Sequence, residues 1–349
     1  MKKHILILGA GFSGITSALS AAFFLEKDRR ADVSITVIST LPVASAMHGM
    51  DASGLRKMDA LRESLRTASR IKFIMGVATQ VEAPSHRVIY TSGAGINVWI
   101  TYDKLILATG SRIVKPSLEG VEHAFDINPL DETSCLEKHL AALDHYPASD
   151  ARNTIVICGG GFSGIESATR IIARLRTRWG ENTKINIVVV DERPQKSSAL
   201  MHKDEAVGHI MSVDQRLTWF FNARVASLDT NGITLEDGRR IGSKTVVWTG
   251  GYRASELTRH IPAERDCLGR LHVDHHLQVI GNPNIFAIGD VAFSTATDDG
   301  RYPTFLYQVA TSMGDLAGHN VVADILGVAR RDLYHAEKTG LDSVSDLHR

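Results

Sequence analysis

The residues best suited to chemistry are two short glycine-rich segments that repeat within the chain. Residues 9–18 are GAGFSGITSA and residues 159–168 are GGGFSGIESA, so the copies differ only at their second and eighth positions. Both contain the spacing G-x-G-x-x-G, in which the first glycine permits a tight turn and the second lets a pyrophosphate approach the backbone. The third lets helix and strand pack closely. Backbone N–H groups and the positive helix end would hold the phosphates.

We therefore predict two dinucleotide-binding loops. Their residues are Gly9, Gly11, Phe12, Ser13 and Gly14 in the first copy and Gly159, Gly161, Phe162, Ser163 and Gly164 in the second.

The residues that follow the next strand bear on the choice of dinucleotide. Asp191 and Glu192 stand there in the second copy, and an acid at this place binds a ribose hydroxyl. A carboxylate also repels a 2′-phosphate, so NADH is favoured over NADPH, although Arg193 could turn to meet a phosphate. Ser39 takes this place in the first copy, where its hydroxyl would bind the ribose less strongly than a carboxylate.

The elements around both copies follow one pattern. Each loop lies between an apolar run typical of a strand and a stretch typical of a helix, and a second strand pattern follows. The ranges are 4–8, 15–26 and 33–38 for the first copy and 154–158, 165–179 and 185–190 for the second. Each copy thus opens a β-α-β unit, and we predict an α/β fold with two Rossmann-like dinucleotide-binding domains.

Composition excludes several other classes of protein. Lys plus Arg and Asp plus Glu number 39 each, so no basic excess indicates a nucleic-acid partner. Cys135, Cys158 and Cys267 are too far apart for a disulfide framework or a zinc site, and a reducing cytoplasmic setting is expected. No run of about 18 apolar residues occurs, so we expect no stable membrane insertion.

Two more segments extend the pattern to a known family. Residues 102–110 are typical of a strand ending in small residues, and residues 284–290 of a strand ending in Gly-Asp. With them the chain resembles the FAD-dependent pyridine nucleotide-disulfide oxidoreductases from Lys3 to about residue 325, and type II NADH dehydrogenases most of all. Segments 247–251, 269–274 and 286–290 also carry this resemblance, and Gln308-Val309-Ala310 partly matches that group's A-Q-x-A-x-Q-Q motif.

The resemblance implies a cofactor for each domain. FAD would bind the domain formed by residues 1–115 and 280–349, and NAD(P)H the inserted domain of residues 116–279. Linkers are expected near Lys115-Pro116 and 281–283, where proline punctuates the chain. The resemblance further assigns cofactor contacts to Thr109, Gly110, Gly250, Gly289, Asp290, Thr304 and Phe305. Asp290 would bind the ribityl chain, and a helix beginning near Thr304 or Phe305 would direct its positive end at the reduced flavin.

Two residues are candidates for catalysis. The resemblance places Glu166 near the nicotinamide, and the alternative is a first-turn acid that the helix dipole stabilises. His48 lies in a segment that passes near the flavin in such enzymes and could donate a proton, or it is an ordinary loop histidine. His272, His275 and His276 lack matching Cys or acid spacing, so no metal site is expected.

Other features separate this chain from some relatives. Segment 41–50 has no cysteine where disulfide reductases of this fold carry a pair, and no pair of the kind that sulfide:quinone reductases need is evident. The chain stops at Arg349, and its polar tail from Ala329 lacks a large apolar face for membrane binding. Docking to a membrane for quinone reduction is therefore not expected.

The expected activity is that of an FAD-dependent oxidoreductase. It would accept a hydride from NADH and pass electrons to a small-molecule acceptor, either quinone-like or soluble. Two alternatives stay open at this point. One is a biosynthetic flavoenzyme that acts on a specific metabolite, with or without oxygen, and the other is a non-enzymatic dinucleotide-responsive binding protein. The sequence does not fix the oligomeric state, and a homodimer is one option.

Overall fold

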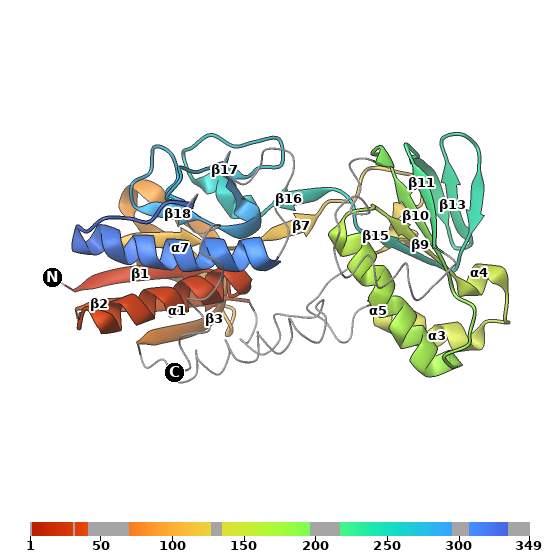
Figure 1. Ribbon diagram of the computed structural model, residues 1–349, viewed down its shortest axis with the longest axis horizontal. Helices are drawn as coiled ribbons and strands as arrows, with labels where there is room; N and C mark the ends of the chain where they lie inside the picture. The colour runs from red at the N-terminus through yellow and green to blue at the C-terminus, as the bar shows by residue number, and fades with distance from the viewer. Residues whose placement is uncertain are drawn as a thin grey trace. The chain divides into compact units, whose positions relative to one another are not determined.

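The computed structural model describes residues 2–30, 32–40, 70–126, 135–195, 217–294 and 307–333, apart from the side chains of residues 162, 163, 166, 307 and 308. Contacts divide these residues into two compact units (Figure 1). The first unit contains the described residues up to Arg112 and from Arg253 onward, and the second unit contains Ile113–Tyr252.

A seven-stranded sheet forms the centre of the first unit, in the order β18-β6-β1-β2-β3-β4-β5. Neighbouring strands from β18 to β3 are parallel, and β3, β4 and β5 form an antiparallel meander. Strands β1 and β2 are buried over most of their length because a parallel sheet is covered on both faces. The bounds are β1 (Lys3–Leu8), β2 (Val33–Ser39), β3 (Ile71–Glu82), β4 (Arg87–Ser92), β5 (Asn97–Thr101), β6 (Lys104–Leu107) and β18 (Ile285–Ala287).

Helices α1 (Phe12–Lys27) and α7 (Tyr307–Leu326) pack side by side in the first unit (Figure 1). Gly314 and Gly318 of α7 face the backbone of α1. A Cβ atom on Gly314 would lie 2.5 Å from the carbonyl oxygen of Ser13, and one on Gly318 would overlap that of Ser17. The two backbones thus approach as closely as glycine allows.

The second unit contains a five-stranded parallel sheet in the order β11-β10-β9-β15-β8. In β9, Ile155 and Ile157 pack with helices α3 and α5, whereas Val156 and Cys158 pack with a three-stranded antiparallel sheet. The bounds are β8 (Phe125–Asp126), α3 (Cys135–Ala142), β9 (Thr154–Cys158), α5 (Phe162–Trp179), β10 (Asn186–Asp191), β11 (Leu217–Phe221), β12 (Val225–Asp229), β13 (Gly232–Leu235), β14 (Arg240–Gly242) and β15 (Thr245–Trp248).

Short elements complete both units. β7 (Ser111–Ile113) and β16 (Tyr252–Ala254) form a two-stranded sheet where the chain passes from one unit to the other, and β17 (Leu271–His272) pairs with β19 (Ala292–Phe293). The helical turns are η1 (Ala83–Ser85), η2 (Val121–His123), η3 (Leu143–His145), α4 (Asp150–Asn153), η6 (Glu256–His260) and η7 (Gly289–Val291).

The second passage between the units comes earlier in the chain than the proline-marked segment 281–283 suggested. The chain is already back in the first unit at Arg253. Segment 281–283 instead forms a turn that leads into β18, in which Asn282 N–H donates to the Val279 carbonyl and Ile285 N–H donates to the Asn282 carbonyl. The proline therefore marks a tight turn within the unit.

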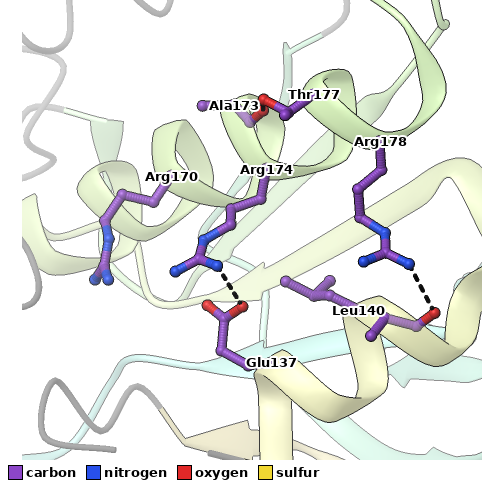
Figure 2. A pocket seen from close by; sticks show the side chains of 8 residues that line it. Glu137, Leu140, Arg170, Ala173, Arg174, Thr177 and Arg178 are labelled. Carbon is purple, nitrogen blue, oxygen red and sulfur yellow. Dashed lines mark hydrogen bonds and ion pairs between the residues drawn. The ribbon is translucent and has the colours of Figure 1, made fainter. Parts of the chain in front are cut away.

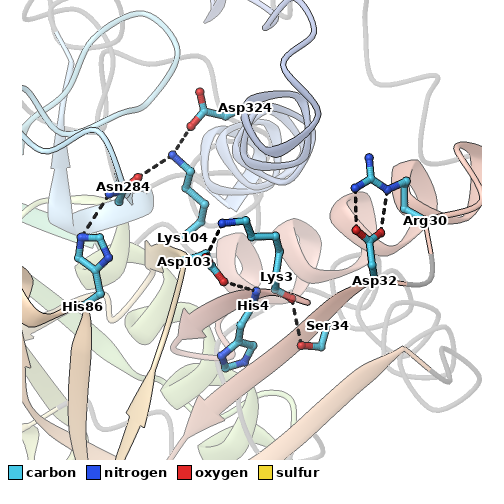
Figure 3. Close-up of polar contacts among 10 residues, drawn as sticks. All are labelled: Lys3, His4, Arg30, Asp32, Ser34, His86, Asp103, Lys104, Asn284 and Asp324. Atoms are coloured by element: carbon cyan, nitrogen blue, oxygen red, sulfur yellow. Dashed lines mark hydrogen bonds and ion pairs between the residues drawn. The ribbon is translucent and has the colours of Figure 1, made fainter. Parts of the chain in front are cut away.

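Polar side chains tie together the amino ends of the strands in the first unit (Figure 3). Asp103 accepts hydrogen bonds from Lys3 Nζ and His4 N–H, both at 2.8 Å. Lys104 Nζ donates to Asn284 Oδ1 at 2.8 Å and pairs with Asp324 of α7. These contacts fix the start of β1, β6 and β18 together, and the glycine loops begin at the opposite, carboxyl end of the sheets.

Candidate functional site

The first glycine loop connects β1 to α1, and its outer glycines are required by packing. Gly9 has φ +101°, and a Cβ atom there would lie 2.7 Å from the carbonyl carbon of Ala108. A Cβ atom on Gly14 would lie 2.9 Å from the Gly9 carbonyl carbon. At Gly11 a Cβ atom would meet no described heavy atom within 4 Å. The loop is thus tight at both ends and open in the middle, where a pyrophosphate would approach.

The second glycine loop repeats this geometry between β9 and α5. Gly159 has φ +124°, and a Cβ atom there would lie 2.8 Å from the Gly250 nitrogen. Thr249 packs against both ends of this loop. Its hydroxyl donates to the Gly159 carbonyl at 2.9 Å, and a Cβ atom on Gly164 would lie 2.9 Å from the Thr249 hydroxyl oxygen. Thr249 was not among the predicted site residues, since a hydroxyl at a strand end carries no spacing signal.

Both loops lead directly into helix N-termini. Gly11 and Gly161 are the N-cap residues of α1 and α5, so neither helix has a capping side chain at that position. The first backbone N–H groups of a helix have no partner within the helix, and they carry the positive end of its dipole. The two loops can therefore bind anionic groups such as phosphates.

A partly buried acid lies beside the first loop. Asp290 follows Gly289 in η7, and its Oδ2 accepts a hydrogen bond from the Ser111 hydroxyl at 2.6 Å. A Cβ atom on Gly289 would lie 2.8 Å from Ser13 Oγ, so η7 contacts the loop itself. Burial raises the pKa of Asp290, against the smaller lowering effects of the Ser111 bond and the Arg270 charge. The resemblance did not name Ser111, which is the hydroxyl that holds this carboxylate.

The segment after β6 places beside the same loop a hydroxyl group that forms no hydrogen bond with the described residues. Thr109 Oγ1 is buried and has no hydrogen-bond partner among the described residues. Gly110 has φ +65°, and a Cβ atom there would meet nothing within 4 Å in the part of the chain that the structure describes. Ser39 ends β2 and is buried. Predicted residues from four separate segments therefore belong to one unit, with an unpartnered hydroxyl and open space near the loop.

Asp191 is arranged differently from the sequence interpretation. It ends β10 and is only 3% exposed. Its Oδ2 accepts from Gly160 N–H at 3.0 Å and Arg193 Nη2 at 2.8 Å, and its Oδ1 accepts from Arg193 N–H at 2.9 Å and Arg193 Nε at 3.0 Å. A carboxylate has about four acceptor positions. The Asp191 carboxylate is thus saturated within the protein and is not a free acid awaiting a ribose hydroxyl.

Two neighbours of Asp191 complete this end of the sheet. The Asp191 carboxylate raises the pKa of Arg193 by hydrogen bonding to the guanidinium group, which keeps that group charged. Glu192 is 64% exposed and pairs with Arg224 at 3.3 Å. Gly250, also predicted here, donates its N–H to the Cys158 carbonyl at 3.1 Å.

Several predicted residues cannot be placed in this geometry. His48, Thr304 and Phe305 lie outside the described residues. The backbone of Phe162, Ser163 and Glu166 belongs to α5, but their side chains are not described. Helix α5 begins at Phe162 and has no acid in its first turn, so the alternative reading of Glu166 as a first-turn acid does not apply.

The histidine and cysteine residues do not form a site in the described structure. Strand β17 ends at His272, so it does not continue to His276. No group of three or more His, Cys, Asp or Glu residues in the described ranges could hold a metal ion. Burial raises the pKa of Cys158 to about 12, so this side chain is a neutral thiol. Cys135 and Cys267 are free and exposed. No helix within the described ranges is long and apolar enough to cross a membrane.

One cavity of about 460 Å³ lies between α3 and α5, away from the loops (Figure 2). Arg174 pairs with Glu137 at 3.1 Å, and Arg178 donates to the Ala141 carbonyl at 3.2 Å. Arg178 also pairs with Asp144. These acids pair with two of the three lining arginines, the third being Arg170, and the lining contains none of the predicted residues. The cavity therefore adds nothing to the two glycine loops.

Two β-α-β units, each with a glycine loop at the carboxyl end of a parallel sheet, define the class of dinucleotide-binding proteins with two Rossmann modules. The family described as pyridine nucleotide-disulphide oxidoreductase matches residues 3–314. The chain belongs to this family and is an oxidoreductase. The predicted family, the α/β fold with two Rossmann-like domains and the prediction of an enzyme are confirmed.

Individual relatives and structures agree with this family. An NADH dehydrogenase-like protein of Mycobacterium tuberculosis is 34% identical over 330 residues, which cover 92% of this chain and 80% of the relative. A type II NADH:quinone oxidoreductase of Staphylococcus aureus is 25% identical and is covered to 86%, with 97% of this chain aligned.

Solved structures share the fold at lower identity. An NAD-dependent persulfide reductase from A. fulgidus has a TM-score of 0.66 at 20% identity over 91% of this chain. The structure of NDH2 from Plasmodium falciparum in complex with NADH has a TM-score of 0.62 at 19% identity over 84% of this chain. This chain spans 59% of the former and 65% of the latter.

Proposed function

We propose that the protein is an FAD-dependent oxidoreductase that takes a hydride from a nicotinamide dinucleotide and passes electrons to a quinone-like or small soluble acceptor. The observation that carries this proposal is the pair of glycine loops, which share a backbone geometry but have different polar neighbours. A partly buried acid from the helical turn η7, distant in sequence, lies beside the first loop, whereas an ion pair of an acid and an arginine lies beside the second. Different neighbours indicate different ligands. The names of the relatives, NADH dehydrogenase-like protein and type II NADH:quinone oxidoreductase, support the same reaction class.

The residues of the first unit suit FAD. The open side of Gly11 and the start of α1 would hold the pyrophosphate, and Ser39 would meet the ribose. Asp290, held by Ser111, would accept hydrogen bonds from the ribityl hydroxyls. Thr109 Oγ1, buried without a partner among the described residues, would gain one from the nucleotide. We therefore assign FAD to the first unit.

The residues of the second unit suit a pyridine nucleotide. The open side of Gly161 and the start of α5 would hold its pyrophosphate. When both cofactors are bound, the nicotinamide supplies a hydride that the flavin accepts, so the cofactors carry the redox chemistry. The chain supplies binding, orientation and fixed positive dipoles, and no side-chain acid or base is needed for this half-reaction. Glu166, His48 and the segment around Thr304 and Phe305 remain proposed contributors.

Absorption spectroscopy tests the proposal directly. The purified full chain should show flavin absorbance, and anaerobic addition of a reduced nicotinamide dinucleotide should bleach it. A colourless protein that does not take up added FAD would contradict the flavin assignment. Oxygen, a soluble quinone and ferricyanide can then be compared as acceptors by the rate at which each restores the colour.

A further inference from the structure

The ion pair of Asp191 and Arg193 beside the second loop is fixed by hydrogen bonds to the backbone and between the two side chains. Four hydrogen bonds from Gly160 and Arg193 fill the Asp191 carboxylate, as described above. The Asp191 side chain is 3% exposed, so solvent does not compete for it. Bidentate contacts between arginine and a carboxylate are among the stronger polar contacts, and here backbone bonds fix the same carboxylate. The pair is therefore a fixed part of the loop, in contrast to an exposed ion pair such as that of Glu192 and Arg224.

The difference between the two glycine loops supports this view. The first loop has Ala10 where the second has Gly160. A Cβ atom on Gly160 would lie 2.5 Å from Asp191 Oδ2 and 2.7 Å from Trp219 Cζ3. Glycine at this position thus lets the Asp191 carboxylate lie against the loop backbone and accept its N–H. In the first unit, the corresponding strand ends in Ser39, and no such acid has to be accommodated.

Arg193 is placed to meet an anion. Its Nη2 atom lies 3.8 Å from the position of a Cβ atom on Gly161, which is the open side of the loop. Its side chain is 48% exposed, although the carboxylate that holds it is buried. The contacts to Asp191 use two of the five guanidinium N–H groups. The other three are thus available to a ligand, so far as the described residues show.

We propose that Arg193, held in place by Asp191, binds the 2′-phosphate of NADPH, so that the second unit accepts NADPH at least as well as NADH. This inference rests on the proposed function, in which the second unit binds a pyridine nucleotide. A free carboxylate at the end of β10 would repel a 2′-phosphate and bind a ribose hydroxyl. Here the charge of Asp191 is balanced, its acceptor positions are filled, and a planar guanidinium group suited to phosphate faces the ligand side. The consequence is the reverse of the preference that the acid alone predicts.

Binding of nucleotide fragments tests this inference without hydride transfer. The probes are 2′,5′-ADP and 5′-AMP, which differ only by the 2′-phosphate, and they are titrated calorimetrically into the FAD-loaded full chain so that the first loop is occupied. We expect the wild type to bind 2′,5′-ADP at least as tightly as 5′-AMP. Arg193→Ala should weaken 2′,5′-ADP binding by about tenfold to a hundredfold, because a charge-assisted contact is lost and Asp191 is left to repel the phosphate. Binding of 5′-AMP should change by less than about threefold.

Two further variants control for folding and for general charge. Arg193→Lys keeps the charge but loses the planar contact to Asp191, so its affinity for 2′,5′-ADP should fall between those of the wild type and Arg193→Ala. Arg224→Ala removes a nearby exposed arginine of the same unit and should leave both affinities unchanged. The ratio of the NADPH and NADH rates of flavin bleaching should follow the fragment affinities across this series.

The outcomes separate this inference from the proposed function. A wild type that binds 5′-AMP more than tenfold tighter than 2′,5′-ADP would overturn the role of Arg193, and so would an Arg193→Ala variant with unchanged affinities. In both cases the binding of 5′-AMP leaves the proposed function standing. If neither fragment binds and neither reduced dinucleotide bleaches the flavin, the proposed function fails, and the inference fails with it.

Discussion

At the scale of single residues, Asp290 combines a cost in stability with a role in binding. Burial raises its pKa, so the folded flavin-free protein holds the Asp290 proton more tightly than the unfolded chain does. Folding stability then falls as the pH rises from the ordinary Asp pKa of about 3.9 through the raised value, because the folded state holds the proton longer than the unfolded state. The same carboxylate is the group that we propose binds the ribityl chain.

Asp290→Asn should therefore separate stability from binding. The flavin-free variant should melt at a higher temperature than the flavin-free wild type at neutral pH, by a few degrees, and this difference should shrink as the pH falls toward 4. FAD occupancy after purification should drop at the same time. Asp32→Asn, at an exposed pair with Arg30, serves as the control and should leave flavin occupancy unchanged. Undiminished occupancy in Asp290→Asn would count against the assigned contact.

Gly160 and Ala10 offer a matched test at equivalent positions of the two loops. Gly160→Ala places a methyl group against Asp191 and Trp219, so it should destabilise the protein by about 1–3 kcal/mol and weaken binding of 2′,5′-ADP. Ala10→Gly adds no atom and should cost less than about 1 kcal/mol. Chemical denaturation measures both changes. If Gly160→Ala is tolerated as well as Ala10→Gly, Asp191 does not have to lie where the structure places it.

At the scale of elements, the close packing of α7 on α1 predicts that a glycine of α7 cannot be replaced without a loss of stability. Gly314→Ala would bring its Cβ atom to 2.5 Å from the Ser13 carbonyl oxygen, on the residue that also contacts Gly289. The variant should lose about 1–3 kcal/mol of stability, because two rigid helix backbones must separate. It should also hold less FAD, since the first loop would move with α1. Ser312→Ala, on the partly exposed side of α7, is the control. Thermal melting and the flavin to protein absorbance ratio provide the readout, and equal values for the two variants would refute this packing argument.

The sequence predicted the elements that carry local signals and missed those that do not. The strands β1, β2, β9 and β10 and the helices α1 and α5 lie where the glycine spacing and apolar runs placed them, within a few residues. The meander β3–β5 was not predicted, because its exposed faces mix polar and apolar residues such as Met75 and Trp99. The contacts of Ser111 and Thr249 were missed because they depend on partners distant in the chain. The bidentate contact of Asp191 with Arg193 is local, but a conformation of the side chain decides it, and spacing alone does not.

At the scale of the whole molecule, the repeat has produced two loops with one backbone geometry and different polar surroundings. The first loop acquires an acid from η7, which is distant in sequence. The second has an arginine supplied by the end of its own β-α-β unit. The backbone alone would bind the pyrophosphate of either dinucleotide, so these additions decide which nucleotide each unit prefers. The nucleotide preference of each unit therefore depends on a few polar side chains beside loops that share one backbone geometry.

Hydrogen–deuterium exchange on the full chain can test which unit binds FAD and which binds the pyridine nucleotide. Adding FAD to flavin-free protein should protect peptides that contain the first loop and residues 108–111 and 289–290, because binding stabilises the folded state of the unit that binds. Adding NADPH to the FAD-loaded protein, in the absence of an acceptor, should then protect residues 159–164 and 191–193. Segments remote from both loops, such as β12–β14, provide the internal control. Protection by FAD at the second loop, or by NADPH at the first, would mean that the cofactors belong to the opposite units, because each ligand protects the loop that holds its phosphates.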